Sequence, residues 1–138
     1  MKHYLFFIVL FTAILISCKK GPENRLDEQV NDTTALVKFE GNFMNERWGQ
    51  VSGQAKIYLK NGKYILALEN FVTNNGPDLK VYLSKDKGPA EFIKLSDLKS
   101  TNGNQLYDIP AMPNFIEYKY VLIHCERYNH LFGSALLQ

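Results

Sequence analysis

The chain has 138 residues, a formal net charge of +2 and 46% hydrophobic residues, and its lysines and arginines are scattered along its length. No basic stripe of the kind that nucleic-acid binding requires is present, so nucleic acid is not an expected partner. Aromatic residues are plentiful, glycine and asparagine mark many turns, and few stretches show a helical period. This composition favours an all-β domain.

The first 17 residues are typical of an export signal. Lys2 and His3 give a positive start, and residues 4–16 form an almost unbroken apolar run that is shorter than the roughly 20 residues of a membrane-spanning helix. Residues 15–18, Leu-Ile-Ser-Cys, resemble the lipobox of bacterial lipoproteins. The resemblance implies cleavage before Cys18 and lipid attachment to it; an ordinary signal peptide with a chance cysteine is the alternative.

A lipidated Cys18 would determine where the protein resides. A diacylglycerol thioether together with an amide-linked chain such as palmitate would anchor it firmly, because each buried methylene contributes about 0.8 kcal/mol. The expected location is therefore the bacterial cell envelope, at the periplasmic face of a membrane or at the outer membrane. The expected partner is the membrane itself, and the sequence does not indicate an oligomeric state.

The mature chain divides into a tether and one domain. Removing residues 1–17 leaves about 120 residues, which is enough for a single domain. Residues 18–34 are polar and have few apolar side chains to bury, so we expect a flexible, lipid-anchored tether. A short helix around residues 23–30 would be marginal alone. Residues 35–138 are predicted to form the β domain.

Short strands separated by turn residues fill this domain. We expect them at residues 36–40, 51–59, 64–68, 79–84, 105–109, 118–125 and 131–136, with a short one at 92–95. The fold class that this spacing predicts is a single antiparallel β-sandwich or flattened barrel of about seven to eight strands.

Four details of the pattern make specific predictions. Gly41-Asn42 indicates a turn after the first strand, and Asn61-Gly62, between two alternating runs, predicts a tight hairpin. Residues 79–84 alternate apolar with polar, which predicts one face in the core and one toward solvent. Residues 118–125 are apolar on both faces, as in a central strand that is covered on both sides.

Cys125 is the residue most suited to chemistry. It is one of two cysteines, and if Cys18 carries lipid it has no partner within the chain. An unpaired thiol in an exported protein is a buried inert group, half of an intermolecular disulfide, or a reactive group. Cys125 shares a strand face with two branched aliphatic residues, which favours a core position. Its place at a strand end beside Glu126 and Arg127 is compatible with a redox thiol.

Other chemistries find less support. His124 and Cys125 are consecutive on a strand, so their side chains project from opposite faces and cannot form a nucleophile–base pair. His130 could return toward Cys125, although a turn histidine is the simpler interpretation. These residues do not make a copper or zinc site, and no metal is predicted. There is no Cys-x-x-Cys-His haem motif and no glycine-rich phosphate loop, so a stand-alone enzyme is not indicated.

Four segments, in order, resemble the DM-thirteen domain, also called the electron-transfer DM domain. They are residues 76–84, 103–110, 121–128 and 132–135. The likeness extends from about Phe39 to the end of the chain. It implies a compact β domain of a kind that accompanies b-type cytochrome modules in animals. It also implies a characteristic cysteine that acts in redox transfer, as a bare thiol or by holding a prosthetic group such as haem, and Cys125 matches that position.

The function expected from these observations is an envelope lipoprotein with an electron-transfer β domain, a single redox thiol at Cys125 and a redox protein as partner. His130, Arg127 and Glu126 are the expected neighbours of the thiol. The alternative is a non-catalytic binding or structural module in which Cys125 fills the core.

The segment Gly76-Pro77-Asp78 is interpreted as a structural turn. Proline fixes φ, and the carboxylate of Asp78 can accept backbone N–H bonds within its own loop. We therefore expect these residues to shape the start of the next strand rather than to bind a ligand.

Overall fold

The structure is a computed structural model that describes residues 25–138. The expected signal at residues 1–17 and the first part of the expected tether, which includes Cys18, lie outside the described residues. Residues 25–138 contain no helix, and hence none that is long and apolar enough to cross a membrane.

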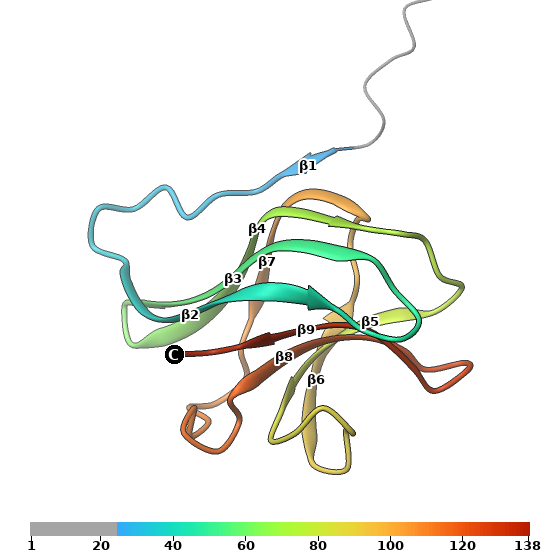
Figure 1. The fold of residues 1–138 in the computed structure, drawn as a ribbon. Coiled ribbons are helices and arrows are strands. Elements are labelled where there is room, and N and C mark those ends of the chain that lie inside the picture. The colour runs from blue at the N-terminus through green and yellow to red at the C-terminus, as the bar shows by residue number, and fades with distance from the viewer. Residues whose placement is uncertain (1–24) are drawn as a thin grey trace, which may run out of the picture.

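The strands of the described chain form one sheet (Figure 1). They are β1 (Leu26–Asp27), β2 (Leu36–Asn45), β3 (Val51–Lys60), β4 (Lys63–Thr73), β5 (Leu79–Ser84), β6 (Phe92–Asp97), β7 (Asn102–Asp108), β8 (Tyr120–Cys125) and β9 (His130–Leu136). Their order across the sheet is β1-β7-β4-β3-β2-β9-β8-β5-β6. Every pairing is antiparallel except that of β1 with β7.

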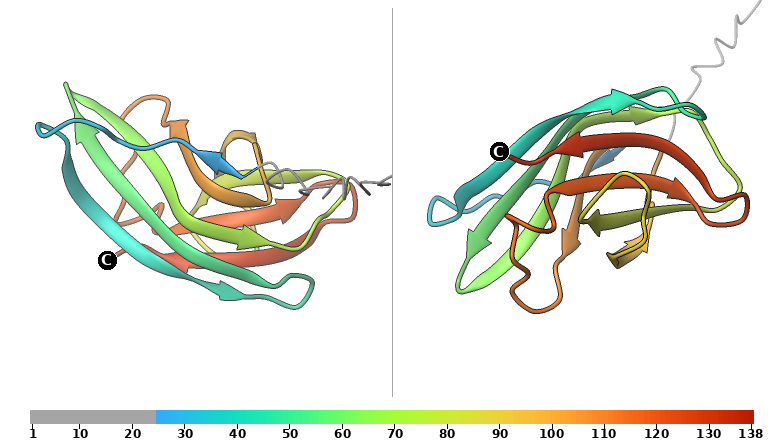
Figure 2. Two further views of the ribbon diagram at one scale, coloured as in Figure 1. Left: turned by 90° about the horizontal axis from the view of Figure 1, so that it is seen from above. Right: turned by 60° about the horizontal axis from the view of Figure 1, so that its bottom comes forward.

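The sheet curls into an open half-barrel with the hydrophobic core inside the curl (Figure 2). β2 joins its two halves, because residues 36–42 pair with β3 and residues 43–45 pair with β9. The predicted all-β class is confirmed. In place of a sandwich of seven to eight strands, the structure has one continuous sheet of nine, since no break in hydrogen bonding separates two layers.

The two predicted turns have opposite outcomes. Asn61 and Gly62 both have positive φ, 50° and 73°, as a two-residue hairpin between β3 and β4 requires, and this prediction is confirmed. Gly41-Asn42 does not turn the chain. β2 runs straight through these residues, which instead mark the place where its pairing passes from β3 to β9.

The described part of the expected tether, residues 25–34, lies against the domain. The segment is extended and does not form the marginal helix that the sequence allowed. β1 pairs with β7 at the edge of the sheet. The Glu28 carboxylate accepts a backbone N–H of β7 at 2.8 Å and the Lys99 ammonium at 2.8 Å, and Asp32 pairs with Lys60 at 3.2 Å. The hydrogen bond from Lys99 is the main cause of a lowered Glu28 pKa. Polar bonds rather than apolar burial hold this segment, so a count of apolar residues could not detect its docking.

β8 is the central strand that its composition predicted. It pairs with β9 on one side and β5 on the other, and residues 121–125 are all buried. Val121, Ile123 and Cys125 point into the main core. Leu122 and His124 point to the outer face of the sheet and are 0% and 4% exposed. Both faces of β8 are therefore covered.

The outer face of β5 differs from the prediction that it faces solvent. All six of its residues are buried, because the chain after β5 folds back over this face. Lys87 reaches Glu46 at 2.7 Å, and the Glu91 carbonyl accepts the Ser84 hydroxyl at 3.3 Å. The ring of Tyr82 stacks on that of Phe92, with 4.2 Å between centroids. A second, smaller cluster thus covers the outside of the half-barrel.

His124 belongs to this outer cluster. Its ring stacks on Tyr82 at 5.4 Å, and its Nε2 lies 3.0 Å from Asn129 Oδ1. Because Oδ1 is an acceptor, Nε2 carries the proton of the neutral ring. Nδ1 is buried and has no partner among the described residues. Burial lowers the pKa of His124 below 6.5, since a charged ring would lose its hydration without gaining an acceptor.

This lowered pKa gives stability a defined pH dependence. As the pH falls through about 6.5, the unfolded imidazole binds a proton before the folded one does, so the free energy of unfolding should decrease. His124→Gln should remove that part of the decrease, while the neighbouring Tyr82, Glu126 and Asn129 stay the same. Urea unfolding of both proteins at pH 7.5 and 5.5 measures the effect. Equal losses in the two proteins would show that His124 does not cause it.

Candidate functional site

Cys125 closes β8 inside the core. Its cross-strand partners are Leu79 of β5 and His130 of β9. The side chain is 1% exposed and belongs to the core cluster, which also includes Phe132. Cys125 is a free cysteine within residues 25–138. Solvent does not reach the thiol in this conformation. An exposed turn, residues 126–129, begins at the next residue.

Of the three expected neighbours of the thiol, His130 is the one placed beside it. His130 lies directly opposite Cys125 in the ladder, so the two side chains share one face of the sheet. The His130 ring continues outward to Trp48, on which it stacks with 3.9 Å between centroids and 5° between planes. His130 therefore links the strand position of the thiol to an exposed indole.

Close backbone contact with β9 positions Trp48. The N–H groups of Glu46 and Trp48 donate to the carbonyls of Phe132 and Leu131, at 3.1 and 3.4 Å. Gly49 is buried against Phe132, where a Cβ atom would meet the Phe132 carbonyl oxygen at 2.5 Å. A glycine is needed here because any larger residue would push this turn, and Trp48 with it, off the strand.

Glu126 and Arg127 do not join the thiol. The Glu126 carboxylate turns to the outer face, where it accepts the Tyr82 hydroxyl at 2.6 Å and pairs with Lys94 at 3.0 Å. These two contacts, with the hydrogen bond from Tyr82 first, lower the pKa of Glu126. Arg127 is exposed in the turn. His124 contacts Tyr82 on the outer face, so the predicted separation of His124 and Cys125 agrees with the geometry.

The turn at Gly76, Pro77 and Asp78 ties the start of β5 to the end of β8. The Asp78 carbonyl accepts the Glu126 N–H at 3.1 Å, and its carboxylate pairs with Lys80 at 2.8 Å. The hydrogen bond from Lys80 lowers the pKa of Asp78, with a smaller contribution from a backbone bond of Arg127. The Gly76 N–H also donates to the Asn75 side chain at 2.9 Å, so bonds within this segment combine with a bond to the end of β8.

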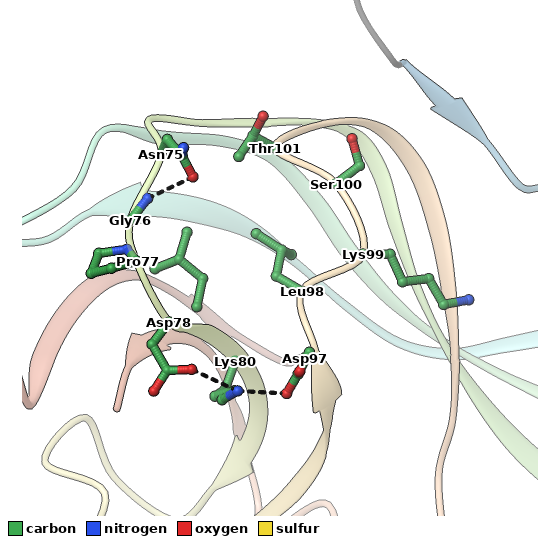
Figure 3. Close-up of a pocket in the computed structure, with 11 residues that line it drawn as sticks. Asn75, Gly76, Pro77, Asp78, Lys80, Asp97, Leu98, Lys99, Ser100 and Thr101 are labelled. Carbon is green, nitrogen blue, oxygen red and sulfur yellow. Dashed lines mark hydrogen bonds and ion pairs between the residues drawn. The ribbon is translucent and has the colours of Figure 1, made fainter. Parts of the chain in front are cut away.

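A pocket of about 340 Å³ separates this turn from residues 97–101 (Figure 3). The Lys80 ammonium lies between the carboxylates of Asp78 and Asp97, at 2.8 and 2.6 Å. These two carboxylates, Asp78 first, raise the pKa of Lys80. The side chain of Lys99 points away from the pocket (Figure 3), and its ammonium donates to the Glu28 carboxylate at 2.8 Å. Lys80 and these two carboxylates thus neutralise one another, and the Lys80–Asp97 pair connects β5 with β6.

A covalently held prosthetic group does not fit Cys125 in this conformation. The thiol is packed among buried side chains, including Leu79 and Phe132 at 7% exposure each, and haem would require the core to open. In residues 25–138 no group of three His, Cys, Asp or Glu side chains is placed to hold a metal ion.

Sequence reasoning did not find Trp48. It lies far from Cys125 in the sequence, and only the pairing of β2 with β9 brings the two regions together. One signal was available, because Trp48 is the single tryptophan of the chain and follows an arginine outside any alternating run.

Comparison with known proteins gives one match. The family described as Electron transfer DM13 matches residues 42–137, which span the second half of β2 to the end of β9 and so include Trp48, Cys125 and His130. Neither the curated proteins nor the solved structures contain a match to this chain. The family match covers most of the sequence, and the chain therefore belongs to the DM13 electron-transfer family.

Proposed function

We propose that this protein is a lipoprotein of the bacterial envelope that takes part in electron transfer through the Cys125 thiol. Family membership supports the redox role. The observation that carries the choice of residue is the pairing of Cys125 with His130, whose ring connects the thiol position to the exposed Trp48. No other cysteine lies within residues 25–138.

The proposed chemistry is thiol–disulfide exchange with a disulfide of a partner protein. The Cys125 thiolate attacks one sulfur, a mixed disulfide forms, and the other sulfur leaves as a thiolate that takes up a proton. Two electrons thereby pass to the leaving sulfur, and Cys125 is oxidised. The sulfur must first be exposed, because it is 1% accessible.

Local opening at the end of β8 supplies that exposure. Cys125 is the last residue of its strand, and the adjoining turn, residues 126–129, is exposed throughout. Turns of this kind open more readily than the strands they connect. The Trp48–His130 stack lies on this end of the hairpin and opposes the opening.

A second candidate function rests on the burial itself. A thiol enclosed by Leu79, Phe132 and the rest of the core packs as a small hydrophobic residue. On this alternative the domain is a non-catalytic binding or structural module of the envelope. The two candidates differ in whether the native thiol reacts faster than the protein unfolds.

Reaction of the full chain, purified in an uncharged detergent, with oxidised glutathione separates them. We expect Cys125 to form a mixed disulfide at a rate at least about tenfold above the global unfolding rate, because a local opening costs less free energy than unfolding. Mass spectrometry measures the adduct, and Cys125→Ser is the negative control. Trp48→Ala should speed the reaction, and Met112→Ala, an exposed residue elsewhere, should not. A reaction at the unfolding rate would assign Cys125 to the core.

The anchor is proposed from residues 15–18, which resemble a lipobox. Cys18 would become the first residue and would lie seven positions before Arg25. A fully extended chain spans roughly 3.3–3.6 Å per residue, so Arg25, the residue before β1, would stay within about 25 Å of the lipid. The membrane is then one partner, and a redox protein of the same compartment is the other.

Lipidation can be measured directly with the chain's two cysteines as matched variants. Cys18→Ala should abolish incorporation of labelled palmitate and cleavage of the apolar leader at residues 1–17, because both depend on the lipobox cysteine. Cys125→Ser should leave both properties unchanged, because the lipobox cysteine is intact. Incorporation that survives Cys18→Ala would contradict the proposed anchor.

A further inference from the structure

Two turns of the domain carry the same sequence pattern. Residues 46–48 read Glu-Arg-Trp, and residues 126–128 read Glu-Arg-Tyr. The first turn connects β2 with β3, and the second connects β8 with β9. In each, the N–H of the fourth residue donates to the glutamate carbonyl at 3.3 Å. The two segments therefore present their side chains from similar turns.

In both turns the glutamate is neutralised within the domain. Each carboxylate accepts one lysine ammonium and one hydroxyl group. The partners are Lys87 and Ser134 for Glu46, at 2.7 Å each, and Lys94 and Tyr82 for Glu126, at 3.0 and 2.6 Å. The negative charge that precedes each arginine is thus bound to a neighbouring segment.

The arginines have no such partner. Every ion pair found within residues 25–138 uses a lysine, and neither Arg47 nor Arg127 forms one. Arg47 lies 4.9 Å from the centre of the Trp48 ring. Arg127 lowers the pKa of Asp78, but the Asp78 carboxylate is bonded to Lys80. Both arginine residues are exposed.

The two turns form one surface. The His130 ring stacks on Trp48 and lies 5.8 Å from the ring of Tyr128, so it joins the aromatic residues of both turns. Trp48 and Tyr128 are 45% and 59% exposed. We call Arg47, Trp48, Arg127, Tyr128 and His130 the arginine–aromatic surface.

We propose that the arginine–aromatic surface docks an acidic polypeptide segment of a partner protein. A guanidinium group binds a carboxylate through two parallel hydrogen bonds, and both guanidinium groups here are available for it. Tryptophan, tyrosine and arginine are also the residues that dominate binding energy at protein interfaces. The nearest carboxylates, Glu46, Glu126 and Asp78, are each bonded to a lysine and compete weakly.

An anionic membrane fits this surface less well. Recognition of acidic lipids uses clusters of about four to eight basic residues, whereas this surface offers two unpaired arginines. One face of the indole is covered by His130, and Arg47 lies over the ring. Insertion among lipid headgroups would have to break this stack.

Trp48 is also the reporter for the test, because it is the single tryptophan. The probe is poly-L-glutamate, added to the full chain in uncharged detergent and low salt. We expect a saturable change in Trp48 fluorescence that weakens as salt is added. Arg47→Gln/Arg127→Gln should weaken binding at least about tenfold. The matched control, Arg25→Gln/Lys63→Gln, removes the same charge from exposed positions elsewhere and should change binding less than about twofold.

Two further titrations serve as controls. The titration is repeated with Cys125→Ser, so that binding is judged apart from the thiol chemistry proposed above. Phosphatidylglycerol vesicles replace poly-L-glutamate in a parallel titration. No binding of poly-L-glutamate, equal weakening by both double variants, or arginine-dependent binding of the vesicles alone would overturn the proposal.

Discussion

The burial of β8 on both faces is the constraint on which the rest of the structure depends. A strand between β9 and β5 alternates its side chains between two environments, and here both exclude water. Cys125 therefore enters the main core, and His124 enters the outer cluster. Adjacent residues of one strand thus hold a buried thiol and a buried imidazole that cannot meet.

Covering the outer face requires the chain after β5 to fold back, and charged residues hold it there. Lys87 and Lys94 both reach glutamates of the two Glu-Arg-aromatic turns. Partly exposed ion pairs contribute about 0–1 kcal/mol each, so their main effect is on position rather than on stability. The consequence for the surface is larger, because the lysines pair with Glu46 and Glu126 while Arg47 and Arg127 take part in none of the ion pairs of residues 25–138.

Two features of the fold could be predicted from short stretches of sequence, because neighbouring residues determine them. The Asn61-Gly62 hairpin follows from the φ values that these residues tolerate, and the central place of β8 follows from its composition. The buried outer face of β5 could not be predicted, because its cover comes from residues 85–92, whose pattern gives no sign of where they fold. The single curled sheet was missed for a related reason. The pairing of β2 with two strands leaves no local signature.

In the candidate site, too, some features follow from the local sequence and others depend on long-range contacts. The core position of Cys125 follows from the alternation along β8. His130 was interpreted more simply as a turn histidine, and the structure places it opposite Cys125 across the β8–β9 pair. Trp48 comes from a different hairpin, and backbone contacts with β9, among them that of Gly49 with Phe132, place it on His130. Long-range backbone contacts therefore decide which residue stacks on the cross-strand neighbour of the thiol.

One turn, residues 126–129, serves both the thiol and the arginine–aromatic surface. Exposure of the Cys125 sulfur requires this turn to move, and Arg127 and Tyr128 are part of it. A partner that binds the closed surface stabilises the closed turn, and by linkage it must slow any reaction that needs the open one. A partner that receives electrons from Cys125 must instead bind the open form of the turn at least as tightly as the closed form. The proposed docking and the proposed thiol exchange would therefore be coupled, and the sign of the coupling would depend on which form of the turn the acidic segment prefers.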